Sequence, residues 1–586
     1  MPDPQLVLAA RVQDALSAAF GPSYADADPV IRPSQFADLQ ANVALPLAKR
    51  LQGERGEKQN PREIANEIVA KLDVADVASG VEVSGPGFIN FTLSDAWIAG
   101  QAQRMLEDER LTVPKAAEPQ TVVVDYSAPN VAKEMHVGHL RTTIVGDSIV
   151  RMLEFLGHKA IRQNHLGDWG TQFGMLIEHL LDVGEEAAAA DLSAGHINRF
   201  YQAARAKFDS DPGFAERSRR RVVTLQSGDP ETLRLWQQFI DDTVVYINKV
   251  YARLGVTLTD ADLAGESIYN AMLDTVSEEL ESSGVAQLSD GALCVFPPGF
   301  TGRDDAPIPL IIRKSDGGYG YATTDMAAIR HRVRDLGADR IVYVVGADQS
   351  LHFQMVFAAA RMAGWLPDGV RAEHAQIGMV LGTDGKRFRT RSGESVRLID
   401  LLDEAVERAA AEYDKVNPDD SLGSEARARI ADAVGIGAVK YADLAVARDS
   451  EYIFDFDRMI SFKGNTGPYL QYAIARIRSI FRKAGTEPGS ATGPIVIGEE
   501  AERALALQLL GFGTAVEQAY DAAEPHKLAS YIYSVADAYT TFHENCPVLK
   551  APDEATKASR LALCAVTLRT LTTGLGLLGV PTPERM

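Results

Sequence analysis

One stretch of this sequence constrains the fold more than any other, because it reads as a strand, a loop, a helix and a second strand in direct succession. Residues 121–125 are mostly β-branched and apolar, residues 140–156 carry apolar side chains at helical spacing up to Gly157, and residues 159–164 again have the character of a strand. Strands joined by a helix in this way lie parallel in one sheet, with the helix packed on a face of that sheet. The stretch therefore predicts an α/β core built on a parallel sheet.

The loop between the first of these strands and the helix ends with His136, Gly138 and His139. In a β-α-β unit this loop lies at the carboxyl edge of the sheet, which is where α/β proteins bind ligands. The helix N-terminus favours an anion there, Gly138 lets a ligand approach the backbone, and two imidazoles can donate hydrogen bonds to phosphate oxygens. The loop predicts a nucleotide site; the alternative is a helix start with two incidental histidines.

The segment His136-Val-Gly-His139 matches the His-x-Gly-His signature of class I aminoacyl-tRNA synthetases, and residues 127–139 as a whole resemble the version found in arginyl-tRNA synthetases. The resemblance implies that Gly138 and both histidines contact ATP. It implies catalytic roles for His136 and His139, which would stabilise the pentacoordinate α-phosphate, and for Lys133, which would stabilise the phosphates.

The resemblance also implies a binding pocket for arginine. A guanidinium carries five donors in a planar fork and prefers bidentate carboxylate acceptors, so such a pocket needs acidic groups that converge from several strands. The family's arginine-binding positions fall on Asp125, Asn130, Tyr321, Asp325 and Gln349. These residues border the strand 121–125, a helix expected over 326–336 and a strand expected over 340–345, so their loops can face one edge of the sheet. The first of them lies where the family often has glutamate.

A glycine-bounded basic loop, residues 382–393, follows a strand expected over residues 375–381. Its cations suit a mobile clamp on the triphosphate or the pyrophosphate leaving group, and the alternative is an exposed arginine-rich hairpin. The loop stands where class I synthetases have a Lys-Met-Ser-Lys-Ser sequence and departs from that motif, a departure for which Lys133 would compensate. By resemblance Lys386 is catalytic, and Lys386, Arg391 and His352 bind ATP.

The chain reads as an α/β multidomain protein with a Rossmann-type catalytic core. We expect a small α+β domain over residues 1–112, a catalytic domain over 113–395 with an insertion at about 183–309, and an all-helical domain over 396–586. Within the insertion, residues 292–296 and 310–314 have strand character.

Both flanking domains resemble tRNA-binding modules. In the N-terminal one, residues 81–93 predict two strands around a Gly-Pro-Gly turn, and Phe88 and Asn90 match positions at which the family stacks on and reads an extruded base of the tRNA elbow. The alternative is a sheet in which Phe88 packs inward. The helical domain resembles the family's anticodon-binding domain, and Arg476 lies on its first tRNA-facing helix.

The formal net charge of −21 argues against non-specific coating of nucleic acid and against a DNA partner. It does not exclude tRNA, because tRNA binding needs a local basic face rather than a basic average. Candidate faces, each of which also reads as an ordinary solvated helix or loop, are residues 217–221, residues 386–391, and the group Arg476, Arg478, Arg482 and Lys483.

Other features exclude several protein classes. The sequence has no run of about 18 uncharged apolar residues, so no membrane span is expected. The 3 cysteines are scattered without Cys-x-x-Cys spacing, so neither a disulfide framework nor structural zinc is expected. The first residues lack the basic and apolar regions of a signal peptide. A cytoplasmic protein without a metal site of its own is expected.

Together these features predict an arginine:tRNA ligase, expected to be a monomer. Arginine and ATP, which carries Mg²⁺ with it, would form arginyl-adenylate, and the 3′-terminal ribose of tRNA(Arg) would then accept the arginyl group. One alternative is another class I synthetase, which the acidic pocket and the missing zinc spacing disfavour. The other is a non-catalytic tRNA-binding paralogue, which need not keep Lys133, His136, Gly138 and His139.

Overall fold

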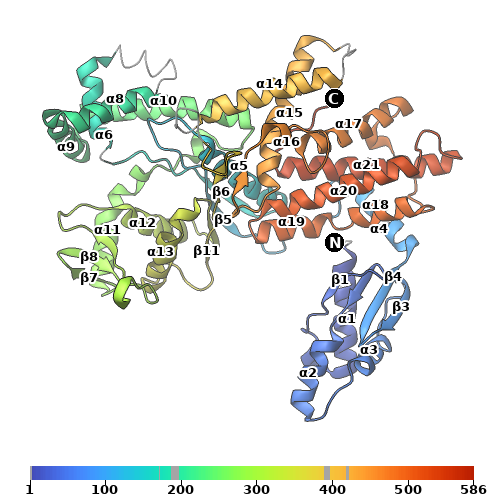
Figure 1. Ribbon diagram of the computed structural model, residues 1–586. Coiled ribbons are helices and arrows are strands. Elements are labelled where there is room, and N and C mark those ends of the chain that lie inside the picture. Colours follow the sequence, from blue (N-terminus) through green and yellow to red (C-terminus); the bar gives the residue numbers. More distant parts are fainter. Residues whose placement is uncertain (1–2, 171, 186–196, 389–395, 417–421, 492) are drawn as a thin grey trace.

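The computed structural model shows a multidomain α/β protein, which confirms the expected fold class (Figure 1). A parallel sheet lies at the centre, a bundle of helices lies on one side of it, and the insertion lies on the other side. The small N-terminal domain, blue in Figure 1, projects beside the helical bundle. The structure describes residues 3–170, 172–185, 197–388, 396–416, 422–491 and 493–586. The expected domain limits at residues 112 and 395 stay predictions.

The central sheet has four parallel strands in the order β11-β10-β5-β6. They are β5 (Thr121–Asp125), β6 (Lys159–Gln163), β10 (Arg340–Tyr343) and β11 (Arg371–His374). The chain runs from β5 outward to β6 and then returns to the other side of β5 for β10. The order in which the chain adds strands therefore reverses between β5 and β10. The loops after these two strands meet at the carboxyl edge of the sheet, where such sheets bind ligands.

Helices cover this sheet. They are α5 (Val137–Phe155), α12 (Tyr321–Arg334) and α13 (Ser350–Met362). Because α5 packs against the sheet on one side and the helical bundle on another, 13 of its 19 residues are buried. Gly146 permits this packing, since a Cβ there would lie 2.3 Å from the Cβ of Tyr126.

Two expected elements differ in position. The helix expected over 326–336 begins at Tyr321, after Gly320. The strand expected over 375–381 is wrong: the sheet strand is β11, and only Val380–Leu381 form a strand, β12, outside that sheet. Between them, Ala375 and Ile377 still donate to the carbonyls of Tyr343 and Val345, at 2.8 and 3.0 Å. The pairing with this segment ends at Gly378, whose amide donates to the Arg448 carbonyl at 2.7 Å.

The insertion has a helical and a sheet-containing part. Its elements, with α6 leading into them, are α6 (Gln172–Val183), α8 (Ile197–Ser210), α9 (Pro212–Gln226), α10 (Pro230–Leu254), α11 (Leu273–Ser282), β7 (Ala286–Ser289), β8 (Ala292–Val295) and β9 (Leu310–Arg313). The last two confirm the expected strands. They pair antiparallel in a three-stranded sheet of their own, β7-β8-β9.

The N-terminal domain packs helices on one face of an antiparallel sheet of order β1-β2-β4-β3. Its elements are α1 (Pro4–Phe20), β1 (Ile31–Pro33), β2 (Leu39–Ala41), α2 (Ala44–Arg55), α3 (Pro61–Val69), β3 (Ala78–Ser84) and β4 (Phe88–Leu93). The last two strands confirm the expected hairpin. Arg503 of the helical bundle donates to both carboxylate oxygens of Asp38, each at 2.7 Å, and so ties this domain to the bundle.

The C-terminal part is a helical bundle with one short strand. Helix α4 (Asp95–Glu107) packs on this bundle. The elements of the bundle are α14 (Leu398–Val416), α15 (Ser424–Leu444), β13 (Tyr452–Ile453), α16 (Phe456–Met459), α17 (Gly467–Ala484), α18 (Glu500–Leu509), α19 (Phe512–Asp521), α20 (Pro525–Asn545) and α21 (Glu554–Leu577). The expectation of an all-helical region is corrected by β13, which pairs in parallel with β12. This pairing joins the bundle to the base of the basic loop.

Substitution of Gly146 by alanine tests the tight packing of α5 on the sheet. The added methyl would overlap Tyr126, so we expect strain of about 1–3 kcal/mol and a lower unfolding temperature by calorimetry. Gly100→Ala is the matched control, because Gly100 lies in α4 with open space around its Cβ position, and alanine there favours the helix by roughly 1 kcal/mol. Equal unfolding temperatures for the two variants would contradict this packing.

Candidate functional site

The two histidines of the β5–α5 turn hold each other in place. The backbone N–H of His136 donates to Nδ1 of His139 at 3.0 Å, and the backbone N–H of Gly138 donates to Nδ1 of His136 at 3.0 Å. These bonds cap the first turn of α5. Since Nδ1 of each ring accepts a hydrogen bond, the neutral rings carry their proton on Nε2. Gly138 is required here, because a Cβ would lie 2.8 Å from the His136 ring.

Both imidazoles are held neutral. Burial lowers the pKa of His139 to about 3, with a further contribution from His136. Burial also lowers the pKa of His136, and Lys133 and Arg387 lower it further. A depressed histidine pKa means that the neutral ring predominates above it. At neutral pH the pair therefore offers two Nε2–H donors without a positive charge of its own.

The loop that leads to the histidines is strained and braced. Ser127, Ala128 and Ala132 have positive φ values of 72°, 48° and 58°, which non-glycine residues rarely adopt. Helix α10 of the insertion supports two of them: the Tyr251 hydroxyl lies 2.6 Å from Ser127 Oγ, and Thr243 Oγ1 accepts from the Ala132 amide at 3.0 Å. The insertion therefore helps to fix the shape of the nucleotide loop.

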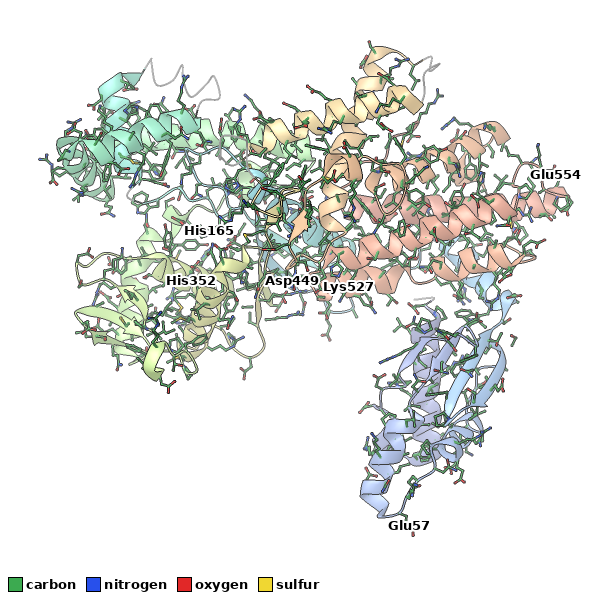
Figure 2. The ribbon with its side chains drawn as sticks, viewed as in Figure 1. Glu57, His165, His352, Asp449, Lys527 and Glu554 are labelled. Carbon is green, nitrogen blue, oxygen red and sulfur yellow. The ribbon has the colours of Figure 1, made fainter. Side chains whose placement is uncertain are left out.

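A cavity of about 720 Å³ opens between the loops that follow β5 and β10. Asn130, both histidines and Gln349 line it, and the backbone of residues 377–380 forms another wall. Asp449 of the bundle, labelled in Figure 2, also reaches it. The cavity thus lies where the strand order reverses, between β5 and β10. Its walls come from both halves of the core and from the bundle.

A second cavity of about 670 Å³ shares Asn130 and the two histidines with the first. Lys133 lines it and lies over the ring of Tyr201 in α8, 4.7 Å from the ring centroid. Arg199 and Arg397 also contribute to its walls. The histidine pair therefore separates two hollows, and Lys133 belongs to the one that faces the insertion.

Asp325 lies in the first turns of α12 and pairs with a residue that we expected in a different role. Its Oδ2 lies 2.5 Å from Nε2 of His352, which is labelled in Figure 2. The expected arginine ligand and the expected ATP ligand are thus direct partners. Tyr321, at the start of α12, is 76% exposed and outside both cavities. Among the expected arginine ligands, Asn130 and Gln349 are those that line the first cavity.

Asp125 is engaged within the protein. Its Oδ2 accepts from Nη2 of the fully buried Arg332 at 2.6 Å, while Nε of Arg332 donates to Gln163 at 2.6 Å. Because the guanidinium already compensates this carboxylate, Asp125 does not provide a free negative charge. The pair instead fixes α12, and with it Asp325, against the end of β5.

Sequence reasoning missed Glu266, a half-buried acid beside Asp325. Burial, together with the nearby charges of Asp168 and Asp325, raises the pKa of Glu266 to about 7. Among the described residues no donor lies within hydrogen-bonding distance of its carboxylate. Carboxylates that crowd one site favour a cation. The missed signal was the Gly265-Glu266 step after an irregular stretch, which no local pattern distinguishes from a helix start.

The described part of the basic loop brings a different cation toward the histidines than expected. Arg387 lines the first cavity and influences His136, whereas the Lys386 side chain is exposed and lines neither cavity. The turn is closed by the Gly382 amide, which donates to the Lys386 carbonyl at 2.7 Å. Arg391 lies outside the described residues.

The expected tRNA contacts lie at a distance from both cavities. Asn90 of β4 is 6% exposed, and its amide is oriented by Gln40 and Ser84, each at 2.8 Å. Phe88 is half-buried on the same strand. Arg476 of α17 donates to the Tyr472 hydroxyl at 3.2 Å and lies over that ring, so the two form one exposed cationic and aromatic unit.

Two of the candidate basic faces are occupied by internal contacts. In residues 217–221, Arg217 and Arg221 pair with Glu178, and Arg219 and Arg220 pair with Glu216. Arg478 donates to the carbonyls of Thr582 and Pro583 and so anchors the end of the chain. These contacts only partly neutralise the two faces, because the side chains of Arg219 and Arg220 stay 65% and 71% exposed and Arg482 and Lys483 are exposed as well.

Two negative findings apply to the described part of the chain. No cluster of three or more histidine, cysteine or acidic side chains there has the geometry to hold a metal ion. No helix there combines the length and apolar character needed to cross a bilayer.

Family models match nearly the whole chain. Residues 6–93 match the arginyl tRNA synthetase N terminal domain, residues 101–456 match the class I (R) tRNA synthetase catalytic domain, and residues 470–586 match the DALR anticodon binding domain. The catalytic match extends past the basic loop and includes β13, in agreement with the pairing of β13 and β12.

Individual proteins agree with these models. The chain is 64% identical to an arginine–tRNA ligase of Thermobifida fusca, with 100% of each chain covered, and 50% identical to one of Streptomyces avermitilis, with 98% of each covered. It resembles the structure of the Plasmodium falciparum arginyl-tRNA synthetase with a TM-score of 0.82 at 28% identity, covering 99% of each chain. The Thermus thermophilus enzyme gives a TM-score of 0.82 at 26% identity, covering 99% of this chain and 100% of that one. The chain therefore belongs to the arginyl-tRNA synthetase family of class I aminoacyl-tRNA synthetases.

Proposed function

We propose that this arginine–tRNA ligase forms arginyl-adenylate in the cavity beside the His136–His139 pair. The observation that carries the proposal is the separation of charge around that pair. Carboxylates lie on the α12 side, at Asp325 and Glu266, while Lys133 and Arg387 lie close to the imidazoles. An arginine with its guanidinium toward the acids and its carboxylate toward the imidazoles would meet the α-phosphate of ATP beside them.

Arginine is recognised by charge and by amides. Glu266 and Asp325 supply the negative charge that a guanidinium requires, and Asn130, Tyr321 and Gln349 contact the remainder of the substrate. Asp125 takes part through Arg332, by fixing α12, rather than through a free carboxylate. Tyr321 is at the surface and would cover the bound arginine if its side chain turned inward.

The chemical step depends on positioning and on stabilisation of charge at phosphorus. The arginine carboxylate oxygen attacks the α-phosphate, and pyrophosphate leaves with the electrons of the bridging P–O bond. His136 and His139 donate Nε2–H bonds to the oxygens that gain charge, and Gly138 lets the phosphate approach. Lys133, Lys386, Arg387 and Arg391 interact with the leaving phosphates, and His352 holds Asp325 beside the nucleotide. Mg²⁺ enters bound to ATP and neutralises phosphate charge.

The second step transfers the arginyl group to the 3′-terminal ribose of tRNA(Arg). The chain contacts the tRNA elsewhere through Phe88 and Asn90 of β4 in the N-terminal sheet and through Arg476 with Tyr472 on the bundle. We expect the chain to act as a monomer. Participation in protein synthesis supports a cytoplasmic location.

The role of the imidazole Nε2–H can be tested by two substitutions of one residue. His139→Asn keeps an acceptor near the position of Nδ1 and so preserves the cap, but it removes the outer donor. We expect kcat for arginine-dependent ATP–pyrophosphate exchange to fall roughly 10²–10³-fold, with arginine affinity unchanged. His139→Gln, whose amide can reach the Nε2 position, should retain more activity. A higher arginine Kd with normal kcat in His139→Asn would contradict this role.

The acidic pocket predicts a pH dependence of arginine binding. Glu266 has a pKa of about 7, so its carboxylate is protonated below that pH and can no longer pair with a guanidinium. Arginine affinity should therefore decrease as the pH falls, with Kd about tenfold higher at pH 6 than at pH 8. Calorimetric titration of the full chain with arginine measures this.

Glu266→Gln is the matched control for that titration, because it keeps the shape of the side chain and removes its proton equilibrium. It should bind arginine weakly at both pH values and lose most of the pH dependence. Asp325 and His352, which pair with each other, face the same site and remain unchanged in this variant. Retention of the full pH dependence in Glu266→Gln would assign it to another group.

A further inference from the structure

Arg141 lies on α5 two residues beyond His139, and its side chain is 1% exposed. Its Nε donates to Asp443 Oδ1 of α15 at 3.1 Å. Its Nη1 donates to two backbone carbonyls, those of Gly378 at 2.9 Å and Ser450 at 2.7 Å. Burial of a guanidinium is costly unless its N–H groups are hydrogen-bonded. Here the acceptors lie on helix α15 of the bundle and on two separate backbone segments, at Gly378 and Ser450.

The two carbonyls mark the base of the basic loop. Gly378 lies two residues before β12, after which the chain enters the loop, and Ser450 lies two residues before β13, which pairs with β12. The backbones touch at this point, since a Cβ on Gly378 would lie 2.4 Å from the Ser450 carbonyl oxygen. Arg141 therefore joins the two segments that lead into these strands.

The same strands carry the cation that faces the histidines. The Phe388 amide donates to the Val380 carbonyl at 3.2 Å, so the loop folds back on β12 and places Arg387 opposite Leu381. Arg387 lines the cavity together with the histidine pair. One rigid helix, α5, thus holds the imidazoles at its first turn and, through Arg141 in the next residues, holds the base of the loop that presents Arg387.

We propose that Arg141 is a positioning residue of the phosphate site, which fixes the distance between the histidine pair and Arg387 of the basic loop. This inference rests on the proposed adenylate-forming function of that site. A lysine at this position could still pair with Asp443, but it has no planar fork with which to bind both carbonyls in a fixed geometry. Misalignment of the histidine pair and Arg387 would slow the reaction at phosphorus and leave arginine binding unchanged.

Arg141→Lys tests the proposal in the full-length protein. We expect kcat of arginine-dependent ATP–pyrophosphate exchange, per titrated active site, to fall by up to roughly 10²-fold, with arginine Kd unchanged. Arg151→Lys is the matched control, because Arg151 lies on the same helix, pairs with Asp147 at 2.7 Å and donates to the Gly255 carbonyl at 2.7 Å, away from the cavity. It should leave kcat unchanged and affect only the unfolding temperature.

A double-mutant cycle with Arg387→Ala separates positioning from a general effect. If Arg141 acts by aligning the loop, Arg141→Lys should cost much less once Arg387 has been removed, so the two changes are not additive. If the losses of kcat caused by Arg141→Lys and by Arg387→Ala simply multiply in the double variant, the proposal is wrong. A lower unfolding temperature of Arg141→Lys with normal kcat per active site would also overturn it. If Arg141→Lys does not fold, Asp443→Asn replaces it with the same expectations. Absence of arginine-dependent exchange in the wild type would instead refute the proposed function.

Discussion

The reciprocal hydrogen bonds of His136 and His139 decide what the rest of this site can do. Because each Nδ1 accepts from a backbone amide, each ring presents an Nε2–H outward, and burial keeps the pair neutral at physiological pH. The bonds also cap α5, so the geometry of the donors and the start of the helix are one structural unit. The strained loop before them, braced by α10, and the tight contact at Gly146 both serve to place this turn at the edge of the sheet.

Around this neutral pair the protein distributes charge unevenly. The chain as a whole is acidic, with a net charge of −21, yet Lys133 and Arg387 lie close to the imidazoles. Burial, and the acids Asp168 and Asp325 close by, raise the pKa of Glu266, so a bound cation would stabilise its charged form. This arrangement gives a direction to a substrate with a guanidinium at one end and a carboxylate at the other.

Much of the fold follows from local sequence patterns. The β5–α5–β6 unit, β10, α13 and the N-terminal hairpin were predictable because each shows a periodicity of its own. Residues 375–379 misled the same reasoning: they continue from β11 with isolated backbone bonds to the segment after β10, and a strand pattern does not distinguish this from a continuous ladder. The family resemblance identified the histidine turn, the acid at residue 325 and the basic loop.

What local patterns cannot show is which distant side chain compensates which charge. Arg332 follows Asp125 by 207 positions in the chain, and nothing near either residue indicates that they pair. The partner of Asp325, the proximity of Glu266 and the contacts of Arg141 with residues near 378 and 450 have the same character. These contacts decide which carboxylates are available to a substrate, and they required the three-dimensional arrangement.

We hold that the acids on the α12 side, Asp325 and Glu266, select arginine for activation beside the histidine pair. The most direct test is ATP–pyrophosphate exchange by the purified full-length chain with each of the twenty amino acids in turn, with and without tRNA. The account predicts exchange with arginine and with no other amino acid. Exchange supported by a different amino acid, or none with arginine in the presence of tRNA(Arg), would contradict it.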